Sequence, residues 1–356
     1  MIKNFYKNKN ILITGANGFK GCWLSLWLHL LGAKVNGIGL KKDYGFFATK
    51  IKLNKIIKFH HLDIKNYKKI KNYINKIKPE LVFHLAGQPL VFDAYKDPIN
   101  TFETNSNGTL NVLEACNKSK FVKTVLCITS DKSYKNINTK KPYKETDTIM
   151  GDDPYSASKS SAEIIINSYQ KTLKRENLGI VVARAGNVIG GGDLSKNRII
   201  PDLVRSILMK KNIILRSPQA TRPWQYVLDP IHGYLLLAMK NYNQSKKFTG
   251  AFNFGPESSQ TINVLKVCRK FLKNWNTSIN ISLSKKQKIK EHGKLVLSIN
   301  KSKKILKWKP VYSVNNSIIK TCEWYRSVYK DKKNVLNITK KQLFYFAINT
   351  KFKFDL

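Results

Sequence analysis

The chain of 356 residues is poor in acidic side chains. Asp and Glu number 22 against 64 Lys and Arg, which gives a formal net charge of +42. The lysines are spread from Lys3 to Lys353 without zinc-finger spacing, a helix-turn-helix signature or an RNP-like aromatic motif. Lys, Asn and Ile are abundant together, as in a product of an A/T-rich genome. We therefore expect nonspecific attraction to polyanions and no specific nucleic-acid partner.

Cysteines and long apolar runs are also scarce. Five cysteines lie far apart without a CxxC pair, which excludes a paired disulfide framework and predicts reduced thiols in a cytoplasmic protein. The first residues lack the apolar region of a signal peptide, and the clusters "WLSLWLHLLGA" and "YLLLAM" are too short to span a bilayer. We therefore expect no membrane association and no metal site.

The first half of the chain alternates short apolar runs with helical patterns. This alternation predicts a doubly wound, Rossmann-type α/β fold, in which helices cover both faces of a parallel sheet. The expected strands are 10–15, 34–40, 56–64, 80–87, 123–130 and 179–190, and the main helices are 18–33, 98–119 and 154–177.

The second half is less regular and predicts a smaller C-terminal α/β substrate-binding lobe. Helices are expected at 198–211, 262–272 and 314–331, with a short strand at 252–256. We assign 1–186 to the dinucleotide-binding domain, with 231–254 returning to it, and 187–230 with 255–330 to the lobe. No role is assigned to 331–356.

Three glycines, Gly15, Gly18 and Gly21, form GxxGxxG directly after the first expected strand and at the start of a helix. Glycine permits a tight turn and lets backbone N–H groups approach a pyrophosphate at the positive end of the helix. In this strand–turn–helix context the triplet predicts dinucleotide binding.

The second strand ends in a loop that leaves NAD and NADP both open. Lys41 and Lys42 would suit a 2′-phosphate, whereas Asp43 would suit a free ribose hydroxyl. Asp63, after the third strand, is a candidate partner for the adenine end of the cofactor.

The stretch "YSASK" places Tyr155 and Lys159 four residues apart on an expected helix. This spacing puts both side chains on one face. A cationic lysine beside a phenol favours the phenolate, so we expect Lys159 to lower the pKa of Tyr155. The tyrosine could then accept the proton of an alcohol while a nicotinamide takes the hydride.

These motifs resemble the extended short-chain dehydrogenase/reductases, and most closely the CDP-glucose 4,6-dehydratase family. The matching stretches extend from about residue 10 to 326 and include "GFKG", "HLAGQPLV", "TSDKSY", "DPYSASK", "ARAGNVIGGGD", "RIIPD" and "ATRPWQYV". The resemblance implies conversion of CDP-glucose to CDP-4-keto-6-deoxyglucose with tightly held NAD, for the synthesis of a deoxysugar in a surface polysaccharide.

The resemblance also implies catalytic roles. Tyr155, assisted by Lys159 and Ser130, would take the C4 hydroxyl proton while hydride passes to NAD. Lys132 would remove the C5 proton as a general base, which requires a lowered pKa. Asp131 would protonate the departing C6 hydroxyl, which requires a raised pKa. Hydride would then return to C6.

Binding residues are likewise implied by matching positions. The cofactor-binding set is Gly15, Asn17, Gly18, Phe19, Gly21, Asp63, Ile64, Leu85, Ala86, Gln88, Asn105, Thr129, Tyr155 and Lys159. The substrate-binding set is Asn187, Arg198, Arg222 and Trp224, of which the tryptophan could stack or simply pack. Glu291 and His292 reverse the family's usual order, and Gly87 replaces its more frequent alanine.

Two other functions stay open at this point. A sugar-nucleotide 4-epimerase or reductase could use the same scaffold, but it should lack Asp131 and Lys132. A noncatalytic dinucleotide sensor, or a nucleic-acid binder, would not need Tyr155 and Lys159. By resemblance we expect a homodimer or higher homo-oligomer, with helices 98–119 and 154–177 forming a four-helix interface.

Overall fold

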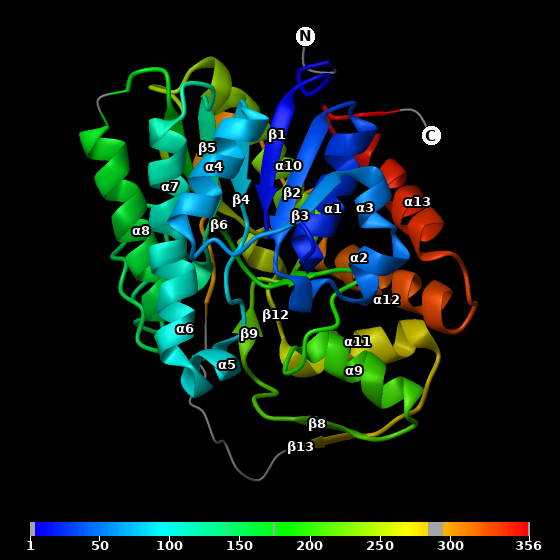
Figure 1. The fold of residues 1–356 in the computed structure, drawn as a ribbon. Helices are drawn as coiled ribbons and strands as arrows, with labels where there is room; N and C mark the ends of the chain where they lie inside the picture. The colour runs from blue at the N-terminus through cyan, green and yellow to red at the C-terminus, as the bar shows by residue number, and fades with distance from the viewer. Residues whose placement is uncertain (1–3, 140, 174, 284–294, 355–356) are drawn as a thin grey trace.

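The computed structural model describes residues 4–139, 141–173, 175–283 and 295–354. Its centre is a seven-stranded sheet in the order β3–β2–β1–β4–β5–β6–β11, and every neighbouring pair is parallel (Figure 1). The strands are β1 (Asn10–Thr14), β2 (Lys34–Gly39), β3 (Lys58–His61), β4 (Leu81–His84), β5 (Thr124–Ile128), β6 (Gly179–Ala185) and β11 (Gly250–Phe254). The predicted doubly wound sheet is confirmed.

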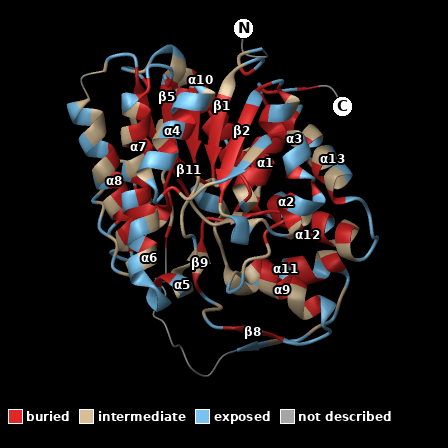
Figure 2. Cartoon of the chain, viewed as in Figure 1, coloured by how far each residue is buried: buried red, intermediate tan, exposed pale blue. Residues whose placement is uncertain are grey.

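Successive residues of the central strands pack into two separate cores. Ile11 and Ile13 of β1 belong to one core, whereas Leu12 between them belongs to the other. Val181 and Val182 of β6 divide in the same way. Because side chains alternate across a strand, a strand buried on both faces is apolar throughout. Figure 2 shows this buried sheet between its helical layers.

Helices cover both faces of the sheet. One core contains residues of α4 (Tyr67–Ile77), α7 (Gly108–Lys118) and α8 (Pro154–Thr172), and the other contains residues of α1 (Phe19–Leu30) and α10 (Leu228–Asn243). The smaller helices of this half are α2 (Phe46–Lys50), α3 (Leu53–Ile56), α5 (Val91–Lys96), α6 (Pro98–Phe102) and the 3₁₀ turns η1 (Lys41–Asp43) and η3 (Asp131–Ser133).

The single helix expected over 98–119 is interrupted. Asp97 caps α6, and a π-helical turn, η2 (Glu103–Asn107), separates α6 from α7. Such turns insert one residue into the helical repeat and often occur at functional sites. Here the turn contains Asn105, one of the residues expected near the cofactor.

The lobe lies beyond the carboxyl ends of the central strands, at the bottom of Figure 1. It contains three two-stranded pairs: β7 (Val188–Ile189) with β10 (Gln225–Tyr226), β9 (Thr221–Arg222) with β12 (Ile262–Asn263), and β8 (Ile213–Leu215) with β13 (Ile281–Leu283). Its helical elements are α9 (Ile199–Leu208), η4 (Ser258–Gln260), α11 (Val264–Trp275), the π-helical η5 (Ser302–Leu306) and α12 (Val314–Tyr329).

The C-terminal segment, for which the sequence suggested no role, completes the large core. Its helix α13 (Val335–Ala347) buries Phe346 edge-to-face against Trp27 of α1, with ring centroids 5.8 Å apart. The Trp27 indole N–H then donates to the Phe352 carbonyl at 3.1 Å. This segment therefore seals the outer side of α1.

The described residues contain neither a membrane-spanning helix nor a metal-binding cluster. None of their helices is both long and apolar enough to cross a membrane, and no group of three or more His, Cys, Asp or Glu is placed to hold a metal ion. The five cysteines are free and buried.

The buried position of Phe346 gives a prediction for the C-terminal helix. Phe346→Ala should lower the free energy of unfolding by about 3–5 kcal/mol, because it leaves a cavity beside Trp27. The neighbouring Tyr345 is 50% exposed, so Tyr345→Ala should change this free energy by about 0.5 kcal/mol or less. Denaturant titration of both variants checks this, and equal losses would show that α13 contributes little to the core.

Candidate functional site

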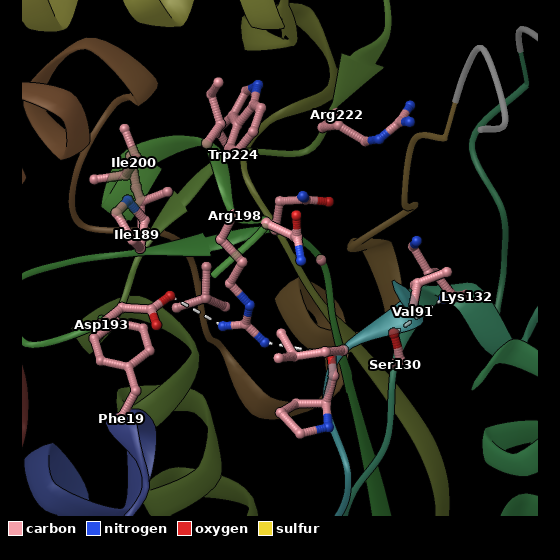
Figure 3. Close-up of a pocket in the computed structure, with 18 of the residues that line it drawn as sticks. Phe19, Val91, Ser130, Lys132, Ile189, Asp193, Arg198, Ile200, Arg222 and Trp224 are labelled. Carbon is pink, nitrogen blue, oxygen red and sulfur yellow. Dashed lines mark hydrogen bonds and ion pairs between the residues drawn. The ribbon is translucent and has the colours of Figure 1, made fainter. Parts of the chain in front are cut away.

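A pocket lies between the carboxyl edge of the sheet and the lobe. The sheet side contributes Ser130, Asp131, Lys132, Tyr155 and Lys159. The lobe contributes Asn187, Arg198, Arg222 and Trp224, and Phe19 and Leu85 come from the cofactor set. Parallel strands end at one edge, so residues far apart in sequence meet there, at the place where α/β proteins bind ligands. Figure 3 shows part of this lining.

The glycine turn is packed too tightly for larger residues. Gly15 has φ +70°, and a Cβ there would lie 2.8 Å from the Ala86 backbone nitrogen. A Cβ at Gly21 would lie 2.1 Å from the Gly15 carbonyl oxygen, and one at Gly18 would lie 3.3 Å from it. Helix α1 begins here without a side-chain cap or an acidic residue in its first turn. These features fit a dinucleotide pyrophosphate.

Three residues of the expected cofactor-binding set also support the local fold. Asn17 donates from Nδ2 to the Leu40 carbonyl at 2.9 Å, which ties the glycine turn to the end of β2. Asp63 accepts from the Lys65 backbone N–H at 2.9 Å. Ile64 is buried in the second core, so its side chain packs internally.

Asn105 holds the loop after β4. Its Oδ1 accepts from the Gln88 backbone N–H at 2.8 Å, while its Nδ2 donates to the Gln88 carbonyl at 3.1 Å and to Ser158 Oγ at 2.9 Å. The amide thus joins the loop to α8, which carries Tyr155 and Lys159. Asn105 therefore positions the cofactor side of the site.

His84 connects the same loop to the glycine turn. Thr109 donates its hydroxyl to the Asn105 carbonyl at 2.6 Å, so it accepts from His84 Nε2 at 3.0 Å. His84 Nδ1 then accepts from Thr14 Oγ1 at 2.7 Å, and Thr14 Oγ1 accepts from the Ala86 N–H at 3.1 Å. Burial lowers the pKa of His84 to about 3, so the ring is neutral and this single tautomer satisfies every partner.

The catalytic candidates meet where β5 ends and α8 begins. Ser130 precedes the short turn η3, donates its hydroxyl to Asp131 Oδ1 at 3.2 Å and accepts from the Lys132 backbone N–H at 3.2 Å. Helix α8 starts at Pro154 after the Asp153 cap, which accepts from the Tyr155 N–H at 2.9 Å. Tyr155 and Lys159 therefore face the pocket from the first turns of a well-capped helix.

Burial shifts the acid–base properties of this cluster. Desolvation raises the pKa of Asp131 to about 6, although the charge of Lys132 opposes the shift. Desolvation also lowers the pKa of Lys159 to about 8. A carboxyl that is partly protonated near neutral pH can donate a proton, as the proposed role of Asp131 requires.

The expected lowering of the Tyr155 pKa is wrong for the ligand-free site. Burial raises this pKa, and the hydrogen bond with Ser130 only partly offsets it. The Lys159 ammonium instead lies against Gly87, where a Cβ would come within 2.8 Å of its Nζ. Glycine in place of the family's usual alanine therefore makes room for the ammonium beside the loop after β4.

The lobe supplies the cationic side of the pocket. Arg198 pairs with Asp193 at 3.0 Å and donates to the Pro89 carbonyl at 3.4 Å, so it spans the pocket from lobe to loop (Figure 3). Arg222 is buried, and its positive charge opposes the rise of the Asp131 pKa. Trp224 donates from its indole N–H to the Ile262 carbonyl at 3.1 Å, which favours packing over stacking on a ligand.

The sequence reasoning overlooked some of these features. Asp193 was not among the expected site residues, yet residues 190–193 are buried, and a Cβ at Gly191 would meet the Trp324 ring at 2.0 Å. Lys20 lines the pocket, and the signal for it was the charged residue in "GFKG". Glu291 and His292 lie outside the described residues.

Comparison with known proteins identifies the family of this chain. A family model described as GDP-mannose 4,6 dehydratase matches residues 12–321. The chain belongs to this dehydratase family. Among its relatives, the CDP-glucose 4,6-dehydratase of Salmonella typhimurium is 36% identical over 333 residues, which cover 91% of this chain and 92% of that protein.

Solved structures share the fold of this dehydratase family member. The UDP-glucose 4-epimerase of Thermotoga maritima, solved with UDP-glucose, superposes with a TM-score of 0.77 at 23% identity, over 90% of this chain and 99% of that one. The dTDP-glucose 4,6-dehydratase of Bacillus anthracis, solved with NAD, superposes with a TM-score of 0.75 at 20% identity. The match covers 90% of this chain and 98% of that one.

The raised pKa of Asp131 predicts that this carboxyl destabilises the fold at neutral and alkaline pH. Its folded-state pKa of about 6 exceeds the ordinary value of 3.8, so the cost is absent below about pH 4 and complete above about pH 7. Asp131→Asn should therefore unfold with about 2–3 kcal/mol more free energy than the wild type near pH 8. The two proteins should converge near pH 4. A difference in unfolding free energy that does not change with pH would contradict this assignment.

Proposed function

We propose that this protein is a CDP-glucose 4,6-dehydratase, which converts CDP-D-glucose to CDP-4-keto-6-deoxy-D-glucose and water. The observation that carries the proposal is the buried Asp131, whose pKa of about 6 suits a general acid, beside Lys132 at the carboxyl end of β5. A 4-epimerase needs only to oxidise and reduce C4, so it has no use for this acid–base pair. The 36% identical relative named for CDP-glucose supports the choice of nucleotide.

The pocket residues divide the reaction into proton transfers. Tyr155 Oη takes the proton of the C4 hydroxyl, and Ser130, its hydrogen-bond partner, orients O4. The C4 ketone acidifies the C5 proton, which passes to Lys132 Nζ. Asp131 gives its proton to the C6 hydroxyl, which leaves as water. In this elimination of water, C5 loses its proton to Lys132 while Asp131 protonates the departing C6 hydroxyl.

The cofactor is proposed to be NAD. When bound, it would accept a hydride from C4 and later return it to C6. The carboxyl of Asp43 suits a free ribose hydroxyl: desolvation and the charge of Asp63 raise its pKa, whereas the charge of Lys42 opposes this rise. The solved dTDP-glucose dehydratase relative also contains NAD.

Arg198, Arg222 and Asn187 are proposed to bind the nucleotide sugar. Guanidinium groups match the paired oxygens of a pyrophosphate, and both arginines face the pocket from the lobe. The product is a deoxysugar precursor, consistent with synthesis of a surface polysaccharide. The buried, free cysteines suit a cytoplasmic enzyme.

A homodimer is proposed from the exposed apolar residues on two neighbouring helical segments. Ile99 and Leu110 are exposed on α6 and α7, and Ile164 is exposed on α8. The α7 and α8 helices pack side by side on the left of Figure 1. A second copy of this face would cover these residues and make a four-helix interface.

A product assay tests the proposed reaction. The purified protein with NAD should convert CDP-glucose, in preference to dTDP-, UDP- and GDP-glucose, to a product that is lighter by one water. Mass spectrometry detects the loss, and absorbance in base detects the 4-keto sugar. Loss of water from none of the four would sink the assignment, whereas an epimerised product would make this chain a 4-epimerase.

The role of Lys132 has a separate test. The C5 position of the 4-keto product should take up deuterium from heavy water in the presence of the wild-type enzyme. Lys132→Ala should slow this exchange about 100-fold or more, because the base that removes the C5 proton is lost.

Lys135→Ala is the matched control, since Lys135 is an exposed lysine three positions further along the chain. It should leave the exchange unchanged. Wild-type exchange in Lys132→Ala would assign the C5 base to another residue.

A further inference from the structure

Lys20 has an unusual position for a lysine. It is the second residue of α1, within the glycine turn, and its half-buried side chain lines the pocket. Its Nζ lies 5.9 Å from the centre of the Tyr234 ring of α10. Among the described residues, no carboxylate forms an ion pair with it within 4.0 Å.

The surroundings of Lys20 are positive. Lys159 of α8 and Arg198 of the lobe both disfavour its charge, and Asp131 favours it. Arg198 already has a partner in Asp193. The first turn of α1 adds the positive end of a helix without an acidic residue or side-chain cap. Positive charge therefore exceeds negative charge around the glycine cradle.

An ammonium without an ion-pair partner is costly even where it is only partly removed from water, as Lys20 is. An apolar side chain would fill the space against Tyr234 without this cost, so packing alone does not explain a lysine at residue 20. Its charge is useful if an anion enters the pocket. Under the proposed function two such anions do: the pyrophosphate of NAD and the pyrophosphate of the nucleotide sugar.

We propose that Lys20 binds a pyrophosphate in this pocket, next to the backbone N–H groups of the glycine turn and across from Arg198. The proposal rests on the proposed function, which supplies two diphosphate ligands. It adds a side-chain cation to a cradle that otherwise consists of backbone groups. NAD and the nucleotide sugar carry the same chemistry, and separate titrations distinguish them.

The position of Lys20 also makes ligand binding depend on pH. Desolvation and the two neighbouring cations lower its pKa to about 7, so the amine is mostly neutral near pH 8. A bound pyrophosphate would raise this pKa and draw a proton onto Nζ. Binding should therefore take up a proton near pH 8 and little near pH 6, where the amine is already charged.

The experiment measures binding of NAD, and separately of CDP, to the full chain freed of nucleotide by charcoal. Lys20→Met keeps the length of the side chain and removes its charge. It should therefore weaken the binding of NAD or of CDP about ten-fold or more. Lys20→Arg should retain most of the affinity. Lys34→Met is the matched control, since Lys34 is an exposed lysine at the start of β2, whereas the pocket lies at the carboxyl edge of the sheet.

Calorimetry in buffers of different ionisation enthalpy gives the proton uptake. The wild type should take up a larger fraction of a proton near pH 8 than near pH 6 with the ligand that Lys20 binds, and Lys20→Met should lose that difference. A merely structural role for Lys20 would not change this uptake. If Lys20→Met does not fold, the proton uptake of the wild type and the ligand affinity of Lys20→Arg still test the proposal.

The outcomes separate the two hypotheses. Weaker binding of NAD alone assigns Lys20 to the cofactor, and weaker binding of CDP alone assigns it to the substrate. Unchanged affinity and proton uptake for both ligands would overturn the proposal. A wild type that binds both ligands without forming the 4-keto product would refute the proposed reaction but leave the role of Lys20 intact.

Discussion

Water is excluded from charged groups at the carboxyl edge of the parallel sheet, and the chemistry of the site depends on this desolvation. The strands all end at this edge, and the lobe covers it. Three titratable groups from different elements share the resulting environment: burial raises the pKa of Asp131 to about 6 and lowers those of Lys159 and Lys20 to about 8 and 7. Burial thus lets the acid keep its proton and lets the amines release theirs, because it disfavours the charged form of each group.

Such an edge is stable only if the surrounding polar groups find partners. Glu163 of α8 accepts from Arg184 of β6 and from Thr129 at the end of β5, at 2.9 and 2.6 Å. This buried network ties the helix that carries Tyr155 and Lys159 to the strand that leads to Ser130. The chain of hydrogen bonds through His84 does the same for the glycine turn and the loop after β4. Removing one member of either network would leave buried groups unsatisfied.

Some expected cofactor residues also have structural contacts of their own. Asn105 and Asn17 hold loops in place through their amides. Ile64 packs in a core. These residues shape the cradle for the dinucleotide, and a resemblance in sequence cannot separate shaping from direct contact. The glycines differ, because the space that a Cβ would need is already filled by backbone atoms.

The sequence by itself determined the alternating fold and the glycine turn, and through the family resemblance it predicted Ser130, Asp131, Lys132, Tyr155 and Lys159 as catalytic candidates. Periodicity and spacing report local geometry, and local geometry fixes where strands end and which residues share a helix face. Tertiary structure alone decided the direction of the Tyr155 pKa, the packing of 331–356 against α1 and the exposure of Lys20 to the pocket. Each of these features depends on which distant segments surround a side chain and how far they exclude water from it. A local sequence pattern does not encode those contacts.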